Sequence, residues 1–105
     1  MKILFSRILV PVLLLVLTTQ LGFALDFTEL ENKANRGDTE AMYELGEMYE
    51  KGVGTIQNYV EAHKWFNIAA SRGQVKALNA RNALAEKMTA EQLAEAQKLA
   101  IQWKP

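Results

Sequence analysis

The chain has 105 residues, half of them apolar, with 12 basic residues balanced by 12 acidic ones and no cysteine. This length suits one small domain, and the lack of cysteine excludes a disulfide framework, a thiolate-bound metal and a thiol nucleophile. Balanced charge gives no electrostatic basis for binding nucleic acid, and a single histidine, His63, excludes a histidine-rich metal site within one chain. We therefore expect a small binding or assembly module without a cofactor, a metal or a small-molecule substrate.

The first 24 residues have the features of a secretory signal peptide. Lys2 and Arg7 give a basic start, an uncharged apolar run covers residues 8–17, and small residues stand at Gly22 and Ala24. This run is too short for a membrane-spanning helix, which needs about 20 apolar residues. The sequence predicts cleavage after Ala24 and export to the periplasm or the cell exterior. An uncleaved leader that tethers the protein to the membrane is the alternative.

Residues 25–105 favour helices over strands, because they are rich in alanine and contain no internal proline. Asp26, Asn58 and Thr89 each precede a Glu or Gln by three residues, which is the pattern of a capping box. Asp38 is a fourth candidate cap, and helix ends are expected at Gly37, Gly52 and Gly73. The sequence thus predicts five helices, over Asp26–Arg36, Asp38–Glu50, Asn58–Arg72, Gln74–Lys87 and Thr89–Trp103.

Two stretches of the chain match each other at an offset of 36 residues. Leu30 matches Phe66, Ala34 matches Ala70, and the Arg-Gly pair at 36–37 recurs at 72–73. A period of this length, with glycine at the breaks, is typical of stacked helical hairpins. We expect an all-α fold, a short solenoid of antiparallel helix pairs. Its complete unit covers about residues 38–73, and capping helices follow over residues 74–103.

Each expected helix carries an apolar face, recognised by its three-and-four spacing. The second helix presents Ala41, Met42, Leu45, Met48 and Tyr49. The third presents Ala62, Trp65, Phe66, Ala69 and Ala70, and the last presents Leu93, Ala96, Ala100 and Trp103. Gly46 would let a neighbouring helix approach closely. Trp103 is expected to fold back against the preceding helix, with an exposed hydrophobic anchor as the alternative.

The residues around the first turn of this expected solenoid have a characteristic spacing. They are Ala41, Leu45, Gly46, Tyr49, Gly52, Gly54, Ala62, Trp65, Ala69, Ala70 and Gly73. The pattern resembles a Sel1-like repeat, a relative of the tetratricopeptide repeats. The resemblance implies a protein–protein interaction scaffold, and exported bacterial members are commonly envelope adaptors. Asn58 stands where the family usually has Asp, and it can still cap the helix. Glu61 stands where the family often has Lys, and this reversal of charge makes surface contacts taken over from the family unreliable.

One polar face of the second helix is a candidate partner-binding surface. It holds Glu40, Tyr43, Glu44, Glu47 and Glu50. In tetratricopeptide-like hairpins the first helix lines the concave side, so these carboxylates would receive a basic peptide, with Tyr43 as an aromatic anchor. A solvated helix face is the alternative, because runs of charge usually face water.

No residues have the spacing of a catalytic site. The sequence Gly52-Val53-Gly54 lacks the other residues of a phosphate loop and predicts a hairpin turn. His63 has too few polar neighbours for a catalytic triad and is expected to be a surface or half-buried structural residue. We therefore predict an exported, non-enzymatic adaptor for protein partners. The alternatives are the membrane-tethered protein and a self-associating one, joined through its unfinished repeat edge or through Leu93, Ala96, Leu99 and Trp103.

Overall fold

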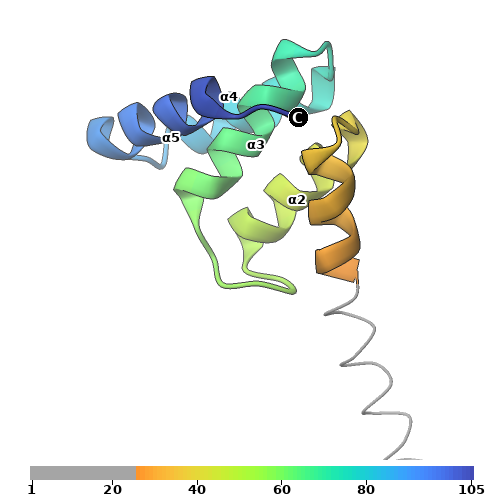
Figure 1. Ribbon diagram of the computed structural model, residues 1–105. Helices are drawn as coiled ribbons and strands as arrows, with labels where there is room; N and C mark the ends of the chain where they lie inside the picture. The colour runs from red at the N-terminus through yellow and green to blue at the C-terminus, as the bar shows by residue number, and fades with distance from the viewer. Residues whose placement is uncertain (1–25) are drawn as a thin grey trace, which may run out of the picture.

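The computed structural model describes residues 26–105, and the predicted leader lies outside them. The described residues form five helices and no strand (Figure 1). The first, here called the N-terminal helix, covers residues 26–35. It is followed by α2 (Thr39–Lys51), α3 (Tyr59–Ser71), α4 (Val75–Ala85) and α5 (Ala90–Gln102). The prediction of an all-α fold with five helices is confirmed. None of the described helices is both long and apolar enough to cross a membrane.

Two of the expected caps satisfy the exposed amide groups at helix starts. The Asp38 carboxylate accepts hydrogen bonds from the backbone N–H groups of Glu40 at 3.1 Å and Ala41 at 3.2 Å. At α5, the Thr89 hydroxyl accepts from the Gln92 N–H at 3.1 Å, and the Gln92 side chain accepts from the Thr89 N–H at 3.0 Å. These reciprocal bonds are the predicted capping box, which fixes the first turn of α5.

The other two expected capping boxes differ from the prediction. Asn58 accepts from the Glu61 N–H at 3.1 Å, but the Glu61 carboxylate pairs with Lys64 at 2.6 Å. Only half of a capping box therefore forms at α3. Asp26 already lies within the N-terminal helix, so the cap predicted there is wrong. Most predicted helix ends lie one or two residues too far out, because the predictions include cap and turn residues, such as the extended N-caps Asp38 and Asn58. The end of α2 is the exception, since it continues one residue beyond the predicted Glu50.

The segment between α2 and α3 is a hairpin turn, as predicted. Gly52 ends α2 in the left-handed conformation (φ 70°), and its N–H donates to the Met48 carbonyl at 2.8 Å. Gly54 is also left-handed, with φ 77°. The Asn58 N–H donates to the Tyr49 carbonyl at 2.8 Å and closes the turn. The two glycines are needed because residues with a Cβ rarely adopt this backbone conformation.

Close packing of α2 on α3 depends on one small residue. A Cβ built at Gly46 would lie 2.5 Å from Cε1 of Phe66, inside the normal contact distance. The lack of a side chain there lets the Phe66 ring pack against α2 and become fully buried. The core around this contact is made of the predicted apolar residues Ala41, Met42, Leu45, Ala62, Trp65 and Ala69. Tyr49 and Ala70 are partly buried and pack against it.

Helix α3 lies at the centre of the domain, in contact with α2, α4 and α5 (Figure 1). Ala77 and Leu84 of α4 and Ala96 of α5 are fully buried. The apolar stripe of α5 therefore packs within the same chain. Ala96 itself therefore has no surface to offer to a second copy, whereas Leu93, Leu99 and Trp103 are only partly buried, and self-association stays a prediction.

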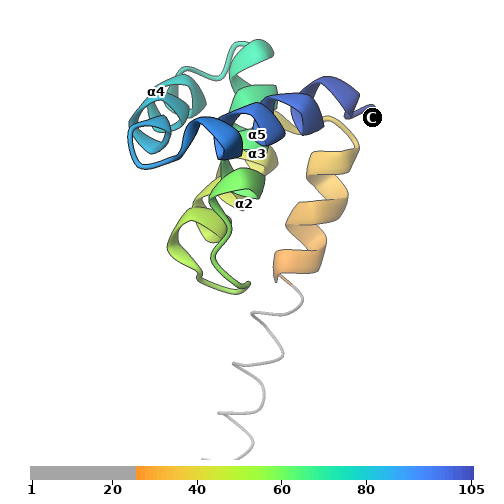
Figure 2. The same ribbon diagram turned by 90° about the vertical axis from the view of Figure 1, so that its left-hand side faces the viewer.

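The C-terminal residues return to the N-terminal helix (Figure 2). Trp103 packs edge-on against Trp65 of α3, with ring centroids 6.1 Å apart, and its Nε1 donates to Oδ1 of Asn35 at 3.3 Å. The Arg72 guanidinium lies 5.1 Å from the centroid of the Trp103 ring. Trp103 thus folds back, as expected, but onto α3 and the N-terminal helix rather than the helix before it.

Candidate partner-binding groove

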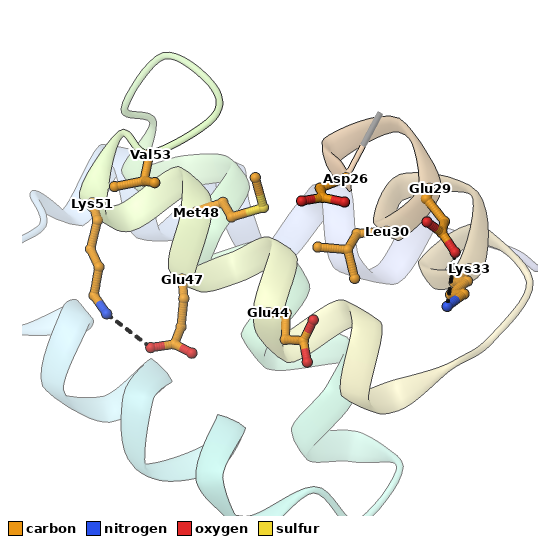
Figure 3. A pocket seen from close by; sticks show the side chains of 9 residues that line it. All are labelled: Asp26, Glu29, Leu30, Lys33, Glu44, Glu47, Met48, Lys51 and Val53. Atoms are coloured by element: carbon orange, nitrogen blue, oxygen red, sulfur yellow. Dashed lines mark hydrogen bonds and ion pairs between the residues drawn. The ribbon is translucent and has the colours of Figure 1, made fainter. Parts of the chain in front are cut away.

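An open groove of about 570 Å³ runs between the N-terminal helix and α2 (Figure 3). Each of the two helices contributes residues at the i, i+3, i+4 and i+7 positions that share one helix face. The lining residues are Asp26, Glu29, Leu30, Lys33, Glu44, Glu47, Met48 and Lys51, with Val53 from the turn. One face of each helix therefore lines the groove. This is the arrangement expected where two helices stand on either side of a site that a third helix could occupy.

The groove has an apolar floor and charged edges. Leu30 and Met48 point toward each other across it, and Val53 lies at one end (Figure 3). Leu30 is partly buried, whereas Val53 is 51% exposed. This combination of a partly exposed apolar floor and polar edges is typical of surfaces that bind another protein.

Carboxylates outnumber ammonium groups on the edges of the groove, by four to two. Both lysines already pair along their own helices: Lys33 with Glu29 at 3.3 Å, and Lys51 with Glu47 at 3.1 Å. The hydrogen bond to Glu47 raises the pKa of Lys51 and keeps its ammonium group charged. Among residues 26–105, Glu44 is exposed and forms no ion pair. The groove is therefore a net negative surface.

The structure divides the predicted partner-binding face of α2 between different surroundings. Glu44 and Glu47 line the groove. Tyr43 instead packs against Phe66, with ring centroids 5.8 Å apart. Burial is the main cause that raises the pKa of the Tyr43 hydroxyl, and the negative charge of Glu47 raises it further. Tyr43 is thus partly used by the fold itself.

The remaining two residues of that face lie outside the groove. Glu40 accepts a hydrogen bond from Nε2 of Gln74 at 2.7 Å, which links α2 to the start of α4. Glu50 is partly buried, and its backbone carbonyl accepts from Nε2 of Gln57 at 2.8 Å. Of the five predicted residues, only two share one concave surface.

The N-terminal helix supplies half of the groove, a contribution that helix periodicity does not predict. Its contribution is Asp26, Glu29, Leu30 and Lys33. A signal was present, because Leu30 matches Phe66 at the repeat offset. That match places Leu30 on a face that binds a neighbouring helix in the complete unit.

His63 is more buried than expected, with 3% of its surface exposed. Its Nδ1 atom has no hydrogen-bond partner, and burial together with the positive charge of Arg81 lowers its pKa. The expectation of a surface or half-buried histidine is wrong, because α3 is covered by three helices and Ser71 is its one exposed residue. The Ser71 hydroxyl donates to the Ile68 carbonyl at 2.6 Å rather than to His63. Residues 26–105 contain no group of three side chains placed to hold a metal ion.

Comparison with known proteins identifies the unit formed by α2 and α3. Residues 39–74 match the model of the Sel1 repeat. The chain therefore contains a Sel1 repeat. It is also similar to the crystal structure of a protective antigen present in uropathogenic Escherichia coli strains, which displays an SLR fold. The two chains are 32% identical, with a TM-score of 0.71 over 73% of this chain and 17% of that one. No curated protein matches the chain.

In general, Sel1-like repeats bind protein partners, and their fold is typically a non-catalytic interaction module. The chain spans about one sixth of the length of the E. coli antigen, so the similarity concerns only that part of the antigen.

Proposed function

We propose that this Sel1-like repeat protein is an exported, non-enzymatic adaptor that binds a protein partner. The observation that carries the proposal is the open groove beside the complete repeat, with its apolar floor of Leu30 and Met48 and its excess of carboxylates. A surface of this kind supplies apolar area for affinity and charge for orientation.

The surroundings of the few candidate nucleophiles and bases support the non-enzymatic part of the proposal. A general base must reach the proton that it removes, and His63 is buried beside Arg81 with no carboxylate paired to it. The Ser71 hydroxyl is held by a backbone carbonyl. Glu44 is exposed on the edge of the groove, so its carboxyl group is open to water and is not enclosed as a catalytic acid usually is.

The test of partner binding is affinity capture from an envelope extract of the cells that make the protein. We expect the wild-type chain to retain a specific protein, and the double variant Glu44→Lys/Glu47→Lys to lose most of it. The variant Glu86→Lys/Glu95→Lys is the matched control, because it changes the net charge equally at exposed sites outside the groove. Equal capture by the wild type and both variants would contradict the proposed role of the groove.

Export rests on the sequence of residues 1–24, and N-terminal sequencing of the protein from fractionated cells tests it. A mature chain that begins at Leu25 in the periplasmic or secreted fraction supports export. A chain in the membrane fraction that still begins at Met1 supports the tethered alternative.

Self-association is a second candidate, favoured by large apolar side chains on the surface. Ile56 is 87% exposed and Ile101 of α5 is 82% exposed. Sedimentation equilibrium decides between the two candidates. A mass that rises with concentration and returns to that of a monomer in an Ile101→Lys variant supports self-association, whereas a constant monomer mass excludes it.

A further inference from the structure

The groove and the packed interface of the complete repeat are equivalent positions of the same architecture. At the repeat offset, Leu30 corresponds to Phe66 and Met48 corresponds to Leu84. Phe66 and Leu84 are fully buried, and Phe66 is covered by Tyr43 and Gly46 of α2. Leu30 and Met48 are only partly buried, and they border the open groove. Helix α2 thus fills a place beside α3 and α4. In the described part of the chain, the equivalent place beside the N-terminal helix and α2 is empty.

We propose that this groove binds a basic amphipathic helix of a partner protein, which lies against the N-terminal helix and α2 as α2 lies against α3 and α4. The proposal rests on the adaptor function proposed above and names the kind of partner that the adaptor takes. The bound helix supplies a small apolar face for Leu30 and Met48, and basic side chains for the carboxylates at the edges.

Charge selects a basic helix over a second copy of α2. Helix α2 itself is acidic, because it carries four glutamates and only one lysine, Lys51. A copy of α2 in the groove would bring these carboxylates toward Glu44 and Glu47 on the groove edge. Like charges in contact oppose association, whereas lysines or arginines at the same positions would favour it.

The chain's own sequence one repeat length before α2 does not carry the signature of the repeat. Residues 3–15 stand at that distance, and Pro11 occurs at the position of Glu47, in the middle of α2. Val16 and Thr18 stand at the positions of Gly52 and Gly54, both of which need the left-handed backbone that β-branched residues avoid. The repeat signature is therefore not completed by these residues, and we assign the occupant of the groove to another protein.

A synthetic helix tests this assignment directly. The probe is a fluorescein-labelled peptide with the sequence of residues 38–52 in which Glu40, Glu44, Glu47 and Glu50 are each replaced by lysine, with its helicity checked by circular dichroism. The control peptide has the unaltered acidic sequence. Both are titrated into the full chain, and binding is followed by fluorescence anisotropy. We expect the basic peptide to bind and the acidic peptide to bind at least tenfold more weakly.

Two exposed glutamates on the protein provide the matched variants. Glu44→Lys lies on the groove edge, and Glu95→Lys makes the same charge change on α5. We expect Glu44→Lys to weaken binding of the basic peptide about fivefold, the effect of one exposed ion pair at its upper range, and Glu95→Lys to change it less than twofold. The methyl NMR signal of Met48 should shift on binding of the peptide.

Three outcomes would overturn the inference. They are failure of the helical basic peptide to bind, equal binding of the acidic peptide, and equal weakening by the two variants. Equal binding of the acidic peptide would identify a second copy of α2 as the occupant. If the peptide fails while affinity capture of a partner still succeeds, only the groove assignment falls and the adaptor function stands.

Discussion

The two edges of the Sel1 repeat differ in how they are completed. Toward the C-terminus, α3 packs against α2, α4 and α5; Phe66 is covered by α2, and both Phe66 and Leu84 are fully buried. On the N-terminal side, the equivalent residues Leu30 and Met48 line a groove of about 570 Å³. The same repeat pattern therefore produces a core at one edge and a binding surface at the other. Within residues 26–105, the difference lies in whether a further helix packs on that edge, and not in the chemistry of the repeat itself.

The largest expected effect comes from truncating equivalent residues at the two edges. Phe66→Ala should lower the free energy of unfolding by about 3–5 kcal/mol, because it leaves a cavity in a sealed core. Leu30→Ala should cost only about 1–2 kcal/mol, since part of Leu30 already faces the groove. Urea unfolding monitored by circular dichroism measures both. Equal losses would mean that the two edges are equally packed.

A smaller effect is expected from filling the gap that admits Phe66. Gly46→Ala adds one methyl group where a Cβ would lie 2.5 Å from the ring. The overpacking should cost about 1–3 kcal/mol, although alanine is the better helix former. Thermal unfolding of Gly46→Ala alone and combined with Phe66→Leu checks this cause. The combined variant should lose less than the sum of the two single variants, and an additive loss would contradict the direct contact.

Next in size is the effect of the buried histidine. The pKa of His63 is lowered from 6.5 by burial and by Arg81, so the unfolded chain takes up a proton first as the pH falls. Stability should therefore decrease as the pH is lowered through 6.5, and level off once the folded protein is protonated as well.

Replacing His63 with leucine is the matching variant, because the equivalent position in the N-terminal helix is the apolar Phe27. His63→Leu removes the unpaired Nδ1 atom and should be about 1 kcal/mol more stable than the wild type at pH 7. The decrease below pH 6.5 should also become smaller. Urea unfolding at pH 5, 6 and 7 tests both effects, and an unchanged pH dependence would assign it to other groups.

The smallest effect on stability is expected from the groove charges. Glu44→Lys/Glu47→Lys changes residues on the open edge, so the free energy of unfolding should stay within about 0.5 kcal/mol of the wild type. Partner capture should nevertheless fall, and that contrast separates a binding surface from a structural one. A loss of stability as large as that of Gly46→Ala would show that the groove residues support the fold.

The sequence predicts this fold well because its determinants are local. The turn glycines, the caps at Asp38 and Thr89, and the small residue at Gly46 each act on neighbours within one helix or one hairpin. Their spacing is therefore enough to specify the α2–α3 unit, and the confirmed Sel1 match covers this part of the chain.

The candidate site was predicted only in part, because it depends on how separate helices meet. Helix periodicity predicts that Tyr43 and Glu44 share one polar face. In the structure Tyr43 packs against Phe66 of α3, whereas Glu44 lines the groove. The burial of His63 was missed for a similar reason. Helix periodicity assumes that one side faces water, and α3 is surrounded by three other helices.

The hydrogen bond between Trp103 and Asn35 joins the end of the chain to the N-terminal helix, across 68 positions in the sequence. Arg72 adds a cation beneath the same indole ring. To swing away from α2, the N-terminal helix would have to break this tether. This contact therefore helps to hold one wall of the groove in place before any ligand arrives, and such preorganisation reduces the entropy that binding must overcome.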